Sequence, residues 1–190
     1  DRNPNVRGAL MTGLIDTLPE ERLEDLGSKI DSGEVRTVLS VKEDLTEAGL
    51  SEEQLSKVDI VYLGTHRNAT SEKADVVLAG LTQFEKSGTV INQQFRIQKF
   101  NRVVPGPRGC IEDLYALSTI AANFSNEKFP STVGSIWKQL AGENSQFSEL
   151  SFQSLSDQGQ VLDSSAFEHL PFREGKSLHF EPKREAVAAE

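Results

Sequence analysis

Three short runs of apolar, mostly β-branched residues alternate with helix-like segments, and this alternation constrains the fold more than any other feature. The runs are VRTVLSV at 35–41, DIVYLGT at 59–65 and ADVVL at 74–78. β-branched residues favour strands, and strands that alternate with helices pair in parallel through crossover connections. We therefore predict an α/β fold with a mainly parallel sheet and helices on both faces.

Helix signals fall between these strands and beyond them. An apolar repeat of three to four residues after an acidic first turn predicts a helix over about residues 20–30. A capping-box pattern at Ser51 and Gln54 predicts the start of a second helix. Apolar stripes predict two further helices, over residues 110–124 and from about residue 131 to residue 142.

The chain of 190 residues suits one domain with an appended tail. The predicted α/β domain covers residues 1–143. From Asn144 onward the sequence is rich in Ser and Gln with isolated Phe and Leu, so we treat residues 144–190 as a C-terminal extension that wraps over the domain or a partner. The loop-like start at Asp1, DRNPN, suits a piece of a longer protein.

Charge and cysteine content exclude several classes of function. Acidic residues number 29 against 20 basic ones, and the resulting net charge of -9 makes nucleic acid a poor partner. No apolar run approaches the roughly 20 residues that cross a bilayer, so we expect no direct membrane insertion. Cys110 is the only cysteine, and the spacing of His66, His169 and His179 matches no metal motif. Any iron-sulfur cluster must therefore be bound elsewhere.

Candidate ligand-binding groups follow the second predicted strand. Open α/β sheets bind ligands beyond the carboxyl ends of their strands, and the segment GTHRNAT at 64–70 lies at such an end. The hydroxyl and amide groups of Thr65, Asn68 and Thr70 suit hydrogen bonds to a cofactor. The same groups also suit an ordinary strand-to-helix cap, and both readings stay open.

The segment from Ala74 to Gln98 resembles a family pattern. The pattern reads A-D-V-V-L-P and then E-K-x-G-T-x-x-N-x-x-x-R-x-Q, and it is typical of the molybdopterin oxidoreductase superfamily. That superfamily includes formate dehydrogenases and the large iron-sulfur subunit of NADH-quinone oxidoreductase. The upstream segment NVRGALMTGL also resembles the complex I branch. The matching residues after the strand are Glu85, Lys86, Gly88, Thr89, Asn92, Arg96 and Gln98.

The resemblance implies a Rossmann-like domain of the formate dehydrogenase/DMSO reductase type, from the C-terminal part of the complex I subunit. Such a domain serves as a scaffold and is not itself catalytic. No cofactor is expected in this piece, and the iron-sulfur clusters are expected in the rest of the subunit. The expected partners are other subunits of a respiratory complex, peripheral on the cytoplasmic side of the inner membrane.

The chain departs from the family pattern at two places. Ala79 replaces a usual Pro, and Gln94-Phe95 replaces a usual Glu-Gly. A bulky Phe removes backbone freedom and obstructs a cofactor, which favours a retained fold over a working pterin site.

Two alternatives remain. In a true molybdopterin-dependent enzyme, such as a formate dehydrogenase, a dinucleotide cofactor would be lined by Thr65, Asn68, Thr70, Asn92 and Arg96. In a non-catalytic interaction module, the acidic surface and the tail would dock another subunit. The sequence preceding this chain in the intact protein would separate the complex I subunit from the molybdopterin-dependent enzyme.

Overall fold

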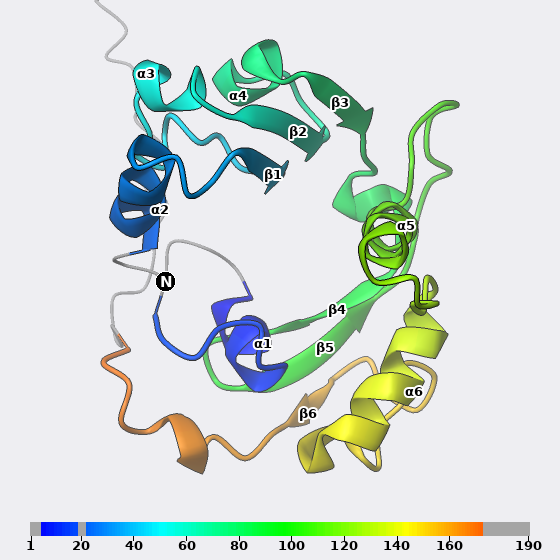
Figure 1. Cartoon of the computed structure of the whole chain (residues 1–190). Coiled ribbons are helices and arrows are strands. Elements are labelled where there is room, and N and C mark those ends of the chain that lie inside the picture. The colour runs from blue at the N-terminus through cyan, green and yellow to red at the C-terminus, as the bar shows by residue number, and fades with distance from the viewer. Residues whose placement is uncertain (1–4, 19–21, 173–190) are drawn as a thin grey trace, which may run out of the picture.

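The computed structural model describes residues 5–18 and 22–172. Two groups of elements make up these residues, with α5 at the side between them (Figure 1). One group contains the parallel strands and the other contains α1, the remaining strands and α6. In chain order the helices and strands are α1 (Val6–Met11), α2 (Arg22–Asp31), β1 (Thr37–Val41), α3 (Glu52–Leu55), β2 (Asp59–Gly64), α4 (Ala69–Lys73), β3 (Val76–Ala79), β4 (Gly88–Ile91), β5 (Arg96–Phe100), α5 (Asp113–Ser125), α6 (Val133–Glu143) and β6 (Gln160–Val161), with short 3₁₀ turns at Gln83–Glu85, Ser145–Phe147 and Ser165–Phe167.

The three predicted strands form a parallel sheet in the order β1-β2-β3. Val38 is paired with Ile60, and Tyr62 with Val77, so these side chains share one face. Ile30 from α2 and Leu55 from α3 pack against that face with Val38 and Ile60. The predicted α/β class and the three strands are therefore confirmed.

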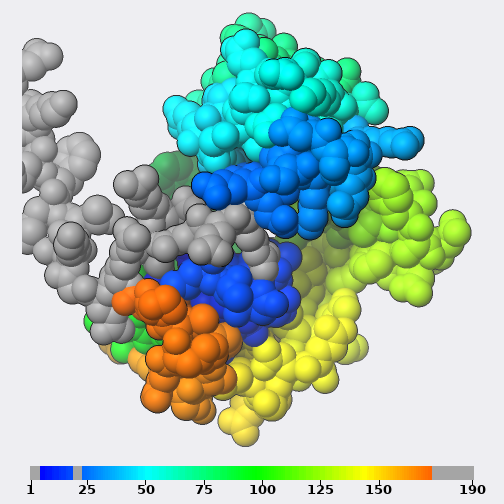
Figure 2. Space-filling view, turned by 60° about the vertical axis from the view of Figure 1, so that its left-hand side comes forward, coloured from blue at the N-terminus to red at the C-terminus, as the bar shows by residue number. Residues whose placement is uncertain are grey.

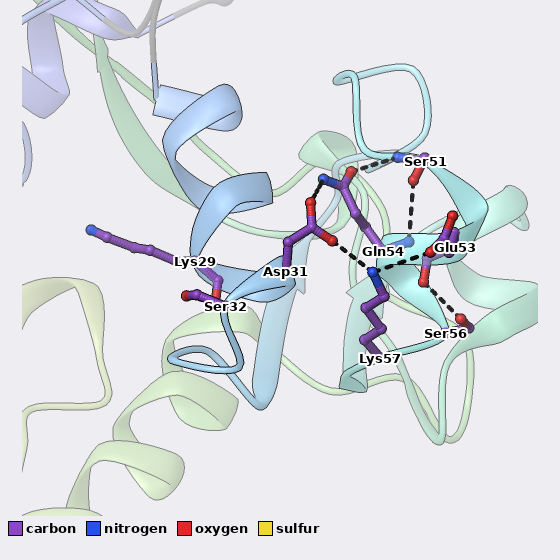
Figure 3. A network of polar contacts seen from close by, with 8 residues as sticks. All are labelled: Lys29, Asp31, Ser32, Ser51, Glu53, Gln54, Ser56 and Lys57. Atoms are coloured by element: carbon purple, nitrogen blue, oxygen red, sulfur yellow. Dashed lines mark hydrogen bonds and ion pairs between the residues drawn. The ribbon is translucent and has the colours of Figure 1, made fainter.

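A polar network on the outside of this core joins α2 to α3 (Figure 3). The carboxylate of Asp31 accepts a hydrogen bond from Gln54 Nε2 at 2.9 Å and pairs with Lys57 Nζ at 2.8 Å. Gln54 also completes the capping box with Ser51 that the sequence predicts. These bonds set how α2 and α3 lie over the sheet.

The opposite face of the parallel sheet is partly bare among the described residues. Leu39, Val61 and Val76 lie side by side on that face, and Leu39 is 40% and Val76 47% exposed. We expected helices on both faces, because parallel sheets are normally covered on both. The helices α2, α3 and α4 all contribute to the core on the first face, and only the carboxyl end of the second face, at Leu63, is fully buried.

A second sheet is antiparallel, in the order β4-β5-β6. The sequence indicates a strand only around Arg96 and Gln98, and this sheet as a whole is not predicted. Its third strand is the short β6, at Gln160–Val161, from the Ser-rich segment. A second core unites α1, this sheet and α6; its buried members are Met11, Ile91, Phe95, Ile97, Trp137, Phe147, Leu155 and Leu162. Part of the predicted extension thus packs in the same core as α1.

Phe95 has a special position in the hairpin between β4 and β5. Its φ of 54° is left-handed, and its amide donates to the Asn92 carbonyl at 3.0 Å. Hairpin loops of this kind favour Gly at the left-handed residue, which explains the usual Gly of the pattern. The Phe95 ring is buried, stacks on Phe167 with centroids 5.7 Å apart and meets Phe172 edge to face at 5.8 Å.

The C-terminal described segment lies against α1 through these aromatic rings. The guanidinium of buried Arg7 lies 4.1 Å from the centre of the Phe172 ring, at cation-π distance. The segment after residue 160 covers the region beside α1 in the space-filling view (Figure 2). Leu162 also donates its amide to the Phe95 carbonyl at 3.0 Å. The residue that replaces Gly therefore packs against the segment from Leu162 to Phe172.

The remaining helices agree with the sequence. α5 and α6 lie where apolar stripes predict them, and Thr132 caps α6 by accepting a hydrogen bond from Ser135 N. Trp137 is buried in the second core against Phe147. α2 begins at Arg22 in the structure, and the predicted start at residues 20–21 lies outside the described residues.

Candidate functional site

The carboxyl edge of the parallel sheet brings together three connecting segments. Lys42 follows β1 with a left-handed φ of 62°, and its amide donates to the Leu63 carbonyl of β2 at 2.8 Å. The loop from Thr65 to Asn68 follows β2, and Gly80 follows β3. Ile111, just before α5, pairs in parallel with Gly80 and extends the same edge. This edge is where an open α/β sheet holds a ligand.

Asn68 uses both ends of its amide inside the protein. It is the N-cap of α4: its Oδ1 accepts from Ser71 N at 2.8 Å, and Ser71 Oγ accepts from Asn68 N. Its Nδ2 donates to the Tyr62 hydroxyl at 3.1 Å. The strand-to-helix cap is therefore present, and it uses the groups that a cofactor would need.

Thr70 is fully buried beneath the same loop. Its Oγ1 accepts a hydrogen bond from Leu45 N at 2.7 Å and donates to the carboxylate of Asp44 at 3.2 Å. Asp44 also accepts from Thr46 and from Ala69 N at the start of α4. Chiefly the hydrogen bond from the Thr46 side chain holds the pKa of Asp44 below its ordinary value. This network ties the loop after β1 to α4.

Thr65 and the two residues after it are the accessible part of the loop. The Thr65 hydroxyl lies 2.8 Å from His66 Nδ1, and both His66 and Arg67 are exposed. His169 is exposed in another part of the molecule, and His179 lies outside the described residues. Among the described residues no three His, Cys, Asp or Glu side chains group as a metal site would require.

Asn92 and Arg96 lie in the antiparallel sheet, away from the loop after β2 in sequence and in sheet. Asn92 Oδ1 accepts from the backbone amides of Gln94 and Arg96, so its side chain shapes the hairpin. Arg96 Nη1 donates to the Gln158 carbonyl at 3.2 Å, beside β6. Thr65, Asn68 and Thr70 thus follow a strand of the parallel sheet. Asn92 and Arg96 belong to the hairpin of the antiparallel sheet.

These five residues do not fit a dinucleotide as they stand. Asn68, Thr70 and Asn92 use their polar atoms within the protein, and the ring of Phe95 is buried where the family pattern has Gly. Two hollows on the surface of the described residues lie elsewhere: one of about 370 Å³ between α5 and α6, and one of about 140 Å³ beside α1. None of the five residues lines either hollow.

A charged cluster that the sequence does not reveal closes the same edge. Lys42 Nζ lies 2.6 Å from Asp113 Oδ2 and donates to the Leu81 carbonyl at 2.9 Å. Lys86, from the family pattern, pairs with the same carboxylate oxygen. Asp113 is the first residue of α5. Lys42 and Asp113 are 71 positions apart, so no local pattern could have found the pair.

Burial affects the charge state of this cluster. The pKa of Lys42 lies below its ordinary value, because burial disfavours the ammonium and neighbouring Lys86 opposes it, although Asp113 acts in the other direction. The side chains of Lys42, Lys86 and Asp113 are 28%, 21% and 14% exposed. The crevice edge therefore has its own internal ion pairs.

Parallel strands that alternate with helices, and polar groups gathered at their carboxyl ends, define an open-sheet α/β domain. Within that class, residues 7–123, more than half of the chain, match the family of molybdopterin oxidoreductases, and the chain belongs to this family. The matched region contains the parallel sheet, the hairpin with Phe95 and most of α5.

Two relatives show the range of this family. The chain is 32% identical over 92 residues to an F420-dependent formate dehydrogenase 1 subunit alpha of Methanococcus maripaludis, an alignment that covers 47% of this chain and 14% of the relative. It is also 32% identical over 71 residues to the mitochondrial NADH-ubiquinone oxidoreductase 78 kDa subunit of Candida albicans, covering 37% of this chain and 10% of the relative. The chain thus spans a small part of either relative.

Residues 5–18 and 22–172 contain no helix with the length and apolar character needed to cross a membrane.

Proposed function

We propose that this chain is the C-terminal scaffold domain of the large iron-sulfur subunit of an NADH-quinone oxidoreductase. The intact protein takes part in electron transfer from NADH to quinone, and this domain performs no chemical step. The iron-sulfur clusters are bound by other parts of the intact subunit. The 78 kDa relative, a subunit of an NADH-ubiquinone oxidoreductase, supports this proposal.

One observation carries the scaffold role: the polar groups at the crevice edge are bonded to each other. Asn68 and Thr70 hold α4 and the loop after β1, and Asp113 holds both Lys42 and Lys86. A side chain whose donors and acceptors are already paired must break those bonds to bind a ligand, which costs free energy. The arrangement thus suits mechanical support better than cofactor binding.

The bare face of the parallel sheet supports the proposal that this domain has a partner. A row of branched apolar residues in which Leu39 and Val76 are exposed and Val61 is half-buried is unusual for a parallel sheet. We expect the remainder of the intact protein or another subunit of the respiratory complex to cover it. The complex would hold the domain peripherally on the cytoplasmic side of the inner membrane.

The second candidate is a part of a molybdopterin-dependent oxidoreductase such as a formate dehydrogenase. The identity to the Methanococcus maripaludis subunit favours it. In that case Thr65, Asn68, Thr70, Asn92 and Arg96 would face the cofactor after rearrangement. A subunit-interaction module, the third candidate, is physically close to the scaffold role and differs in lacking the oxidoreductase assembly.

The test is purification of the intact, tagged protein from its native host under mild detergent. The scaffold proposal expects iron without molybdenum and NADH-dependent quinone reduction in the tagged fraction. Molybdenum with formate-dependent dye reduction would replace it by the second candidate. A tagged protein without iron, molybdenum or either activity would leave the interaction module. Untagged cells taken through the same steps control for contamination.

A further inference from the structure

The cluster at the carboxyl edge of the parallel sheet is unbalanced in charge. Two ammonium groups, from Lys42 and Lys86, meet one carboxylate oxygen of Asp113. All three side chains are more than two thirds buried, in a chain whose net charge is -9. Excess positive charge held away from water attracts an anion.

The carboxylate of Asp113 uses only one of its two oxygens in this cluster. Both lysines contact Oδ2, while Oδ1 is buried and accepts no hydrogen bond from the described residues. Oδ1 lies close to Gly80, where an added Cβ would be 3.2 Å away. A purely structural ion pair gains most when all lone pairs of the buried carboxylate are satisfied. Here the Oδ1 atom of Asp113 is left without a hydrogen bond in the described part of the chain, so the carboxylate matches the two lysines incompletely.

The ammonium of Lys42 has a second contact besides the carboxylate, and a turn fixes the backbone just before Lys86. Lys42 has a left-handed backbone fixed by its amide bond to Leu63, and its ammonium also donates to the Leu81 carbonyl. Lys86 follows the 3₁₀ turn Gln83–Glu85, whose start at Thr82 is capped by Glu85. The Lys42 ammonium would therefore stay at this edge if Asp113 lost its charge, and the turn keeps the Lys86 backbone beside it.

We propose that Lys42 and Lys86 form a binding site for a phosphate-type anion, and that the carboxylate of Asp113 occupies the place of that anion. The site in this chain is closed by its own side chain. Point-charge lysines bind phosphate oxygens well, and the carboxyl edge of an open α/β sheet is where such ligands bind. The inference does not depend on which relative's activity the intact protein shares.

The test measures binding of inorganic pyrophosphate by isothermal titration calorimetry at neutral pH and low salt. Asp113→Asn keeps the shape and removes the charge, and we expect it to bind pyrophosphate about tenfold or more tighter than the unmodified chain, the scale of one charge-assisted hydrogen bond. Adding Lys86→Gln to this variant should abolish the gain. Asp31→Asn is the matched control, because Asp31 also pairs with a lysine, Lys57, but at an exposed site.

Three results overturn the proposal. Asp113→Asn with no gain over the unmodified chain means that the lysines do not form an anion site. An equal gain in Asp31→Asn means that the affinity for pyrophosphate depends on net charge alone. Asp113→Ser, which also removes the charge, provides a second variant. Loss of the fold in both variants, seen by circular dichroism, also overturns the proposal, because a carboxylate that replaces a ligand is dispensable for folding.

Discussion

Replacement of Phe95 separates two opposing effects at one residue. The left-handed backbone, with φ of 54°, costs a side chain about 1–2 kcal/mol that Gly does not incur. The buried ring opposes this: removing a buried Phe costs about 3–5 kcal/mol, of which each aromatic pair, here with Phe167 and Phe172, accounts for about 0.5–1.5 kcal/mol. Burial is larger than strain, so Phe95→Ala and Phe95→Gly both destabilise the chain.

The order of the two variants is the decisive quantity. We expect Phe95→Gly to be more stable than Phe95→Ala by about 1 kcal/mol, since Gly relieves the left-handed strain. At Ile97, buried in the extended strand β5, the order should reverse, with Ile97→Gly less stable than Ile97→Ala by about 0.5–1 kcal/mol. Urea unfolding followed by circular dichroism gives the four free energies of unfolding.

Two results would refute this reasoning. If Gly is the worse replacement at both positions, the backbone at Phe95 carries no strain in solution. If Phe95→Ala changes the free energy of unfolding by less than about 1 kcal/mol, the ring does not anchor the C-terminal segment. Loss of the ring contacts to Phe167 and Phe172 loosens the segment that contains them, so protease cleavage between residues 160 and 172 should accelerate in both Phe95 variants.

Two further predictions concern polar contacts around the parallel sheet, at Thr70 and at Asp31. Thr70→Val should lower the free energy of unfolding by about 1–3 kcal/mol, because the buried amide of Leu45 loses its acceptor. The control Thr65→Val should change the free energy of unfolding by less than about 0.5 kcal/mol. Equal effects of the two variants in urea unfolding would contradict the assigned bonds. The hydrogen bond from Lys57 lowers the pKa of Asp31, so the stability that Asp31 contributes is present above its unfolded pKa and is lost as pH falls through the folded value. The urea midpoints of the unmodified chain and Asp31→Asn should therefore differ at neutral pH and converge as pH falls through the lowered pKa of Asp31, and a gap that persists in stronger acid would show that Asp31 acts without its charge.

Local patterns were sufficient to predict the parallel sheet and several helix ends. The strand runs are β-branched, and the Ser51 capping box lies within four residues, so each signal is contained in a short window. The two readings of the loop after β2 could not be separated, because the choice depends on Tyr62 and Asp44, which meet Asn68 and Thr70 only in the folded chain.

Features that depend on distant segments were missed for a physical reason. The strand β6 is two exposed residues long, Gln160 and Val161, so it has no periodicity to detect. The pairing of Lys42 with Asp113 joins segments that become neighbours only when β1 and α5 meet at one edge. The replacement of Gly by Phe95 was visible in the sequence, but the packing of its ring against Phe167 and Phe172 was not.

The two cores differ in when they can close during synthesis on the ribosome. The core between the parallel sheet and helices α2 and α3 draws its members from one continuous stretch, residues 26–74. It therefore has all its partners while translation is still under way. Met11 belongs to the second core and must wait for Leu162, near the opposite end of the chain. Helix α1 is thus translated before its partners in this core, and its apolar side chains stay exposed to the cell's chaperones until Leu162 has been synthesised.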